Sequence, residues 1–86
     1  MKYRSRTEIS AQMLEIALEG AIKTKIMYRA YLSHAQMKEY LQVLLANGLM
    51  ELDENQIFRT TEKGIRFLKI YQELDPLSPK FSTGGS

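Results

Sequence analysis

The sequence has no cysteine, no tryptophan and a single histidine among its 86 residues. Without cysteine there is no disulfide framework, no thiolate metal site and no thiol nucleophile. His34 alone is a poor start for a tetrahedral zinc site, which takes three or four histidine or cysteine ligands. We therefore expect neither a metal nor a cofactor. The lack of cysteine also suits a reducing cytoplasm, where we expect the protein to reside.

Membrane and catalytic signals are missing as well. No run is apolar and long enough to span a bilayer, and the basic start, residues 1–6, is not followed by the apolar stretch of a signal peptide. There is no glycine-rich phosphate loop and no credible Ser/His/Asp set in so small a chain. We expect no membrane association and no enzymatic activity.

Charge of one sign does not dominate, but it is unevenly placed. Residues 1–38 hold seven Lys or Arg against three Glu, whereas residues 39–86 hold five bases against seven acids. A basic half of this kind hints at nucleic acid. A randomly solvated surface explains it equally well. The length predicts one small domain, which often borrows stability from a partner subunit.

Helix-start signals divide the first half of the chain. Ser5 to Glu8 forms a capping box, and the helix that follows is expected to stop at Gly20. Residues 21–23 are expected to add a brief strand. Thr24 is expected to cap a second helix that runs to about residue 30.

A third helix is expected from Ser33, with Gln36 at the capping-box position. Asn47-Gly48 should end it, since glycine takes the left-handed cap conformation at little cost. Tyr40 is placed at the margin of its apolar face, which is formed by Met37, Leu41, Leu44 and Leu45.

Residues 49–53 and 56–60 are rich in strand formers and flank a short polar turn, which predicts a hairpin. Thr60 or Thr61 should cap a fourth helix over residues 62–74. Asp75-Pro76 should end it, because the residue before proline avoids the α region. Residues 75–86 are expected to be a disordered tail.

The order helix, short strand, helix, helix, hairpin, helix predicts a mostly helical α+β fold. It is a winged helix-turn-helix with one additional C-terminal helix, built from residues 1–74. The third helix would be the recognition helix and the hairpin the wing. In such folds the first turn of the recognition helix meets base edges in the major groove.

Candidate DNA contacts follow from this arrangement. In the third helix they are Ser33, His34 and Gln36, with Lys38 able to reach a phosphate. In the second helix and at the base of the wing they are Lys23, Thr24, Lys25, Arg29 and Arg59. The other interpretation is that these are only solvated positions. The acidic wing tip, residues 53–55, is not expected to enter a minor groove, because phosphates would repel it.

The fourth helix is apolar on two sides. Ile65, Leu68 and Tyr71 make one stripe, and Phe67, Ile70 and Leu74 make the other. A second apolar stripe on a soluble domain indicates a further packing partner. We therefore expect a homodimer in which the fourth helices pair antiparallel, unless the small core uses both stripes. The expected interface consists of Phe67, Ile70, Tyr71 and Leu74.

Four stretches carry a resemblance to a known family. They are residues 4–9 (RSRTEI), 23–28 (KTKIMY), 41–49 with its LL-x-NGL core, and 60–68 (TTEKGIRFL). In this order they resemble the small archaeal winged-helix DNA-binding proteins, which include the Sulfolobus "ten-a" chromatin type and the archaellum-regulator (ArnR-like) winged helix.

The resemblance implies a winged helix-turn-helix, DNA binding without a cofactor, and dimerisation through the last helix. Carried over by position, the DNA-facing set is Lys23, Thr24, Lys25, Ser33, His34, Gln36 and Lys38. Chromatin-type members extend the last helix into a long coiled coil, whereas Asp75-Pro76 ends it early here. A smaller helix pair is therefore expected.

The sequence as a whole predicts a dimeric archaeal protein that binds double-stranded DNA with sequence preference, as a transcriptional regulator. Two alternatives stay open. One is a winged-helix module that binds proteins, which would suit the modest net charge. The other is an abundant chromatin-type DNA-binding protein. No small-molecule effector is evident.

Overall fold

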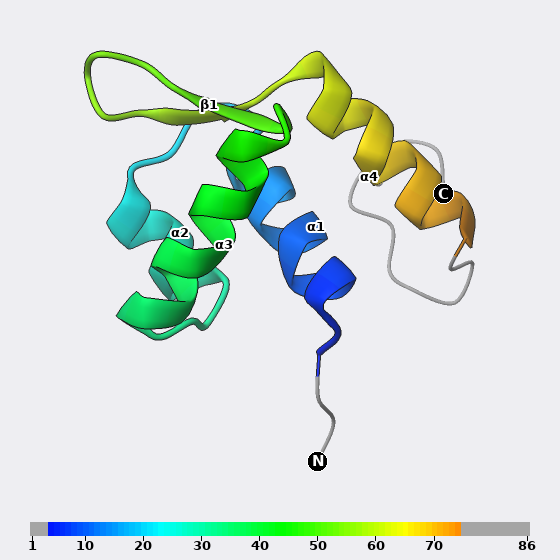
Figure 1. Cartoon of the computed structure of the whole chain (residues 1–86), viewed down its shortest axis with the longest axis horizontal. Helices are drawn as coiled ribbons and strands as arrows, with labels where there is room; N and C mark the ends of the chain where they lie inside the picture. The colour runs from blue at the N-terminus through cyan, green and yellow to red at the C-terminus, as the bar shows by residue number, and fades with distance from the viewer. Residues whose placement is uncertain (1–3, 75–86) are drawn as a thin grey trace.

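The computed structural model describes residues 4–74. The first three residues of the basic start and the expected tail at residues 75–86 lie outside the described residues. Within them the elements are α1 (Arg6–Ile16), α2 (Lys23–Arg29), α3 (His34–Ala46), β1 (Met50–Leu52), β2 (Phe58–Thr60) and α4 (Glu62–Leu74). Figure 1 shows α3 in front of α1 and α2, the hairpin across their upper ends, and α4 on the outer side of α1.

Helix α1 begins as predicted and ends earlier than predicted. The Ser5 hydroxyl accepts the Glu8 N–H at 3.0 Å, and the Glu8 carboxylate accepts the Ser5 N–H at 3.1 Å. The helix stops at Ile16, short of the expected stop at Gly20. The Ala17 carbonyl is free for other donors there, and it accepts the N–H groups of Gly20 and Thr60. The Ala17 carbonyl therefore bonds to Thr60 of β2, and not to an N–H group one turn further along a longer α1.

Helix α2 corrects another prediction. It starts at Lys23 behind Ile22, which makes no side-chain cap, so Thr24 is not the capping residue. The cause is Ala21, whose N–H and carbonyl both bond to Phe58, at 2.9 and 2.8 Å. This bridge fixes the chain direction at residue 21. The expected strand over residues 21–23 is therefore reduced to one residue.

The start and the end of α3 are as predicted. The Ser33 hydroxyl accepts the Gln36 N–H at 3.1 Å, and the Gln36 side-chain oxygen accepts the Ser33 N–H at 3.0 Å. Asn47 is the C-cap, and Gly48 follows with φ +72°. Tyr40, expected at the margin, is buried instead, because its ring packs inward with Met37, Leu41 and Leu44.

The hairpin is shorter than predicted. Met50 pairs with Thr60, and Leu52 pairs with Phe58, in an antiparallel register. The Asp53 carboxylate accepts the N–H groups of Asn55 and Ile57, at 2.8 and 3.0 Å, and so folds the tip upon itself. The Asp53 N–H still donates to the Ile57 carbonyl at 3.0 Å, but the Ile57 N–H bonds to the Asp53 side chain, so both strands end early.

Helix α4 starts at Glu62 and is capped by Thr61, one of the two predicted caps. The Thr61 hydroxyl accepts the Gly64 N–H at 3.2 Å and donates to the Gly48 carbonyl at 2.6 Å. A Cβ at Gly64 would lie 2.3 Å from the Leu49 carbonyl oxygen. Only glycine therefore lets α4 approach the start of the wing this closely.

The core is formed by side chains from all four helices and both strands, and the fold is the predicted winged helix-turn-helix with an additional C-terminal helix. Among the described residues no buried polar side chain lacks a hydrogen-bond partner. The largest fully buried side chains are Met13, Leu14, Ile26, Met37, Leu44 and Met50.

Candidate nucleic-acid interface

The first turn of α3 presents exposed polar side chains at one end of the molecule. Ser33, His34, Gln36 and Lys38 are all exposed. Burial of Met37 and Leu41 on the opposite side of the helix fixes this orientation. The capping box locks the turn, because two otherwise unpaired N–H groups are satisfied there. A rigid, polar helix start of this kind can offer hydrogen bonds to base edges.

Gln36 has a divided role in this turn. Its side-chain oxygen already accepts the Ser33 N–H at 3.0 Å. Bidentate pairing with adenine needs both the oxygen and the NH₂ of a glutamine. Gln36 can therefore offer its NH₂ donors without disturbing the cap. A bidentate contact would require it to give up the bond to Ser33.

The outer face of α3 continues with Ala35, Glu39, Gln42, Val43 and Ala46, all of them exposed. Glu39 is the acidic group on this face. Arg6, at the start of α1, lies 3.9 Å from the Glu39 carboxylate and 5.2 Å from the centre of the Tyr40 ring. The small side chains of Ala35, Val43 and Ala46 would let a ligand approach this face of α3 closely. Arg6 offsets the negative charge of Glu39.

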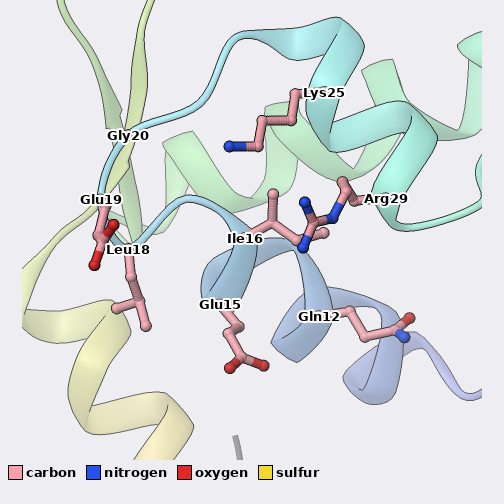
Figure 2. Close-up of a pocket in the computed structure, with 8 residues that line it drawn as sticks. All are labelled: Gln12, Glu15, Ile16, Leu18, Glu19, Gly20, Lys25 and Arg29. Atoms are coloured by element: carbon pink, nitrogen blue, oxygen red, sulfur yellow. The ribbon is translucent and has the colours of Figure 1, made fainter. Parts of the chain in front are cut away.

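The basic residues of α2 face a different direction. Lys25 and Arg29 line a groove of about 600 Å³ between α1 and α2, together with Gln12, Ile16 and other residues. Figure 2 shows Arg29 reaching from α2 toward Ile16 on α1 and Lys25 reaching toward the connection at Gly20, with α3 behind these helices. In Figure 1 α3 is in front. The groove therefore opens away from the outer face of α3.

The groove also contains acidic groups, Glu15 and Glu19. Partial burial raises the pKa of the Glu15 carboxyl above its ordinary value of 4.5. No hydrogen bond or ion pair is formed by the side chains of Glu15, Lys25 or Arg29 within the described part of the chain. Because acidic and basic side chains both line the groove, it is not a simple binding site for phosphate.

Arg59 lies on the groove side rather than beside α3. Its guanidinium donates to the Glu19 carbonyl at 3.3 Å. A Cβ at Gly20 would lie 2.9 Å from the same guanidinium. Gly20 itself has φ +97°. The side chain thus fastens the wing to the connection between α1 and α2, and its remaining N–H groups stay exposed.

Arg4, at the start of the described residues, forms hydrogen bonds within the protein. Arg4 donates to the Gln12 side chain, to the Ala30 carbonyl and, at 3.1 Å, to the Tyr31 carbonyl. These bonds satisfy carbonyls at the end of α2. Arg4 thus ties the start of the described chain to the turn between α2 and α3.

All nine predicted DNA contacts are exposed, but they do not form one cluster. The structure brings together Ser33, His34, Gln36 and Lys38 at the front of α3, and places Lys25, Arg29 and Arg59 around the groove. Lys23 and Thr24 lie at the start of α2. The sequence did not single out Tyr28 and Tyr31, whose side chains are 75% and 81% exposed. Two aromatic residues at the end of a short helix were the available signal.

The predicted interface on α4 has two kinds of residue. Leu68 is buried, and Phe67 and Tyr71 pack against the core. Ile70 and Leu74 are 56% and 79% exposed. Ile65, on the same predicted stripe as Leu68, is 38% exposed because Gly64 takes the inward position. The core therefore uses part of each predicted stripe and leaves one apolar edge uncovered.

Residues 4–74 contain no group of three or more His, Asp or Glu side chains placed to hold a metal ion. None of the described helices is both long and apolar enough to cross a bilayer.

Four helices, a two-stranded wing and an exposed third helix define a winged helix-turn-helix protein. A family profile described as winged helix-turn-helix matches residues 3–78. The chain belongs to this family.

Individual relatives agree with this assignment. An uncharacterised protein of Methanocaldococcus jannaschii is 35% identical over 72 residues, which is 83% of this chain and 73% of the relative. Sso10a-2, a DNA-binding protein from Sulfolobus solfataricus, has a similar structure, with a TM-score of 0.74 at 23% identity. The match covers 86% of this chain and 81% of that one. The predicted resemblance to small archaeal winged-helix proteins is confirmed.

Proposed function

We propose that the protein binds double-stranded DNA by placing the first turns of α3 in the major groove, and that it acts as a sequence-preferring transcriptional regulator. The observation that carries the proposal is the exposed polar front of α3, held by the reciprocal Ser33 and Gln36 bonds. Helix-turn-helix proteins read bases with this part of the recognition helix.

Charge and relatives support DNA as the ligand. His34 and Lys38 are exposed on α3, and Lys23 is exposed at the start of α2. Arg6 lies beside Glu39, which reduces repulsion between that carboxylate and phosphates. A structurally similar protein, Sso10a-2, is described as DNA-binding. We assign base contacts to His34 and Gln36, and backbone contacts to Lys23 and Lys38.

Lys25, Arg29 and Arg59 have a secondary role in this proposal. They surround a groove that opens away from α3. A straight duplex docked on α3 would leave them at its margin. They would contribute phosphate contacts only where the DNA bends around α2, as it does in many complexes.

A homodimer completes the proposal. The exposed pair Ile70 and Leu74 on α4 gives a second copy an apolar edge to cover. A twofold pair would present two α3 helices to one duplex. A DNA-binding regulator of this kind would work in the cytoplasm, where its DNA is.

The rival function is a protein-binding winged helix. The acidic wing, with Asp53 and Glu54, and the exposed Leu52 favour it. The two functions differ in whether the first turns of α3 contact DNA. A protein adaptor would not need His34, Gln36 and Lys38 for affinity to a duplex.

The test compares single substitutions on a preferred duplex and on mixed-sequence DNA. Lys38→Ala should weaken binding to both by the same factor, about tenfold or less, because it removes a phosphate contact. Gln36→Ala should weaken the preferred duplex more, because it removes a base contact. Lys69→Ala, an exposed lysine of α4 away from α3, is the matched control and should bind as the wild type does. Equal affinity of all four proteins would contradict the proposal.

A further inference from the structure

Tyr31 is placed in the molecule in an unusual way. Its backbone is in the left-handed region, with φ +56°, and its side chain is 81% exposed. Glycine adopts this conformation most easily, and a bulky residue there is a genuine outlier. The side chain gains little buried area that could offset this strain. Strained positions that packing does not explain are concentrated at functional sites.

The conformation of the turn does not depend on the Tyr31 side chain. The Tyr31 N–H donates to the Tyr28 carbonyl at 3.2 Å, and the Leu32 N–H donates to the Met27 carbonyl at 3.0 Å. Arg4 donates to the Tyr31 carbonyl from the other side. All three contacts are made by backbone atoms of the turn. Any residue that tolerates a positive φ, glycine above all, would satisfy them equally.

The position of the turn indicates a use for the side chain. Tyr31 lies two residues before Ser33, the N-cap of α3, and Tyr28 lies on the last turn of α2 with 75% of its side chain exposed. In a docked helix-turn-helix, the first helix crosses the DNA backbone while the start of the second enters the groove. The residues that join the two helices are therefore close to the wall of the groove.

A tyrosine suits such a wall chemically. Its hydroxyl donates to a phosphate oxygen, and its ring packs on the apolar face of a deoxyribose. Neither contact depends on the base sequence. A tyrosine also has few rotatable bonds, so little side-chain freedom is lost when it is immobilised.

We propose that Tyr31, supported by Tyr28, binds the sugar-phosphate backbone beside the groove that α3 enters. The strained backbone of the turn is retained because it holds the Tyr31 phenol outward at this place. The inference rests on the proposed DNA binding. It adds contacts that neither the charge pattern nor the sequence motif indicates.

The experiment uses the full chain and measures both thermal unfolding and affinity for two duplexes of unrelated sequence. Tyr31→Gly should raise the melting temperature, because glycine relieves the strain. It should also weaken binding to both duplexes by about tenfold, the loss of one hydrogen bond to a charged group. Tyr31→Phe removes only the hydroxyl. It should weaken binding to both duplexes nearly as much as Tyr31→Gly does, and it should not raise the melting temperature.

Gln56→Gly is the matched control. Gln56 has φ +65° at the wing tip, so glycine relieves the same kind of strain away from α3. It should raise the melting temperature and leave both affinities unchanged.

The outcomes separate the two proposals. If the wild type binds both duplexes and Tyr31→Gly binds them equally well, the tyrosine contact is overturned, and the exposed ring is left for a protein partner. A loss on only one duplex would overturn the backbone assignment. If the wild type binds no duplex at low salt, the proposed function fails, and this inference fails with it.

Discussion

Single residues decide how closely the elements of this small protein approach one another, and Gly64 is the clearest case. A Cβ there would meet the Leu49 carbonyl oxygen at 2.3 Å and the Thr60 side chain at 2.6 Å. Elsewhere in a helix, alanine is about 1 kcal/mol better than glycine. Gly64→Ala should instead destabilise the protein by about 1–3 kcal/mol, because backbone must move.

Urea denaturation checks this prediction. Lys69→Ala, in the same helix but exposed, is the control and should be close to neutral. A Gly64→Ala protein as stable as the wild type would mean that α4 does not sit against the start of the wing.

Glu15 gives a prediction that depends on pH. Partial burial raises the pKa of its carboxyl, so the folded protein holds that proton more tightly than the unfolded chain does. This contribution favours folding below the unfolded pKa and is lost as the pH rises through the folded one. Glu15→Gln should therefore raise the melting temperature at pH 7 and have less effect near pH 3. An equal effect at both values would contradict the burial argument.

Elements were predictable from the sequence where their signals are local. The starts of α1, α3 and α4 follow from Ser5, Ser33 and Thr61, whose side chains bond within three residues. The predicted start of α2 was wrong, because the backbone of Ala21 is fixed by hydrogen bonds to Phe58, which is distant in sequence. Helix periodicity placed Met37, Leu41 and Leu44 inside correctly.

The direction of the α2 side chains could not be predicted, because it depends on where α1 packs. Lys25 and Arg29 are basic and near α3 in sequence, yet they line the groove beside Gln12 and Ile16. The candidate site was therefore predictable for α3, whose capping box and apolar face fix its exposed side. It was not predictable for residues whose surroundings come from other elements.

The capping box of α3 is open to a direct test. Ser33→Ala removes the acceptor for the Gln36 N–H and should destabilise the protein by about 1 kcal/mol. Thr24→Ala is the matched control, since Thr24 was a predicted cap that the structure does not use. It should leave the stability nearly unchanged. Denaturant midpoints measure both, and equal losses would show that Thr24 caps α2 after all.

At the scale of the whole molecule, the uncovered edge of α4 predicts self-association. Ile70→Glu together with Leu74→Glu should convert dimers to monomers without unfolding them, because both side chains are exposed in the single chain. Phe67 is a poor target, since it packs against the core and its loss would disturb folding. Sedimentation velocity measures the mass.

Lys69→Glu is the control for added negative charge on the same helix, and it should stay dimeric. A double variant that sediments with the mass of a wild-type dimer would place the interface on another surface. Loss of the dimer should also weaken DNA binding, since two α3 helices then no longer act on one duplex.

We propose that this winged helix binds duplex DNA through phosphates and bases next to α3. The most direct measurement is fluorescence anisotropy of the wild-type protein on mixed-sequence duplex, repeated across a series of salt concentrations. Each neutralised phosphate contributes about −0.9 to the slope of log affinity against log salt. Lys23 and Lys38 on each of two subunits would neutralise four phosphates, so affinity should fall steeply with salt, with a slope of about −3.6. If the protein does not bind at low salt, or if its affinity does not depend on salt, the proposed DNA binding is wrong and a protein partner is favoured.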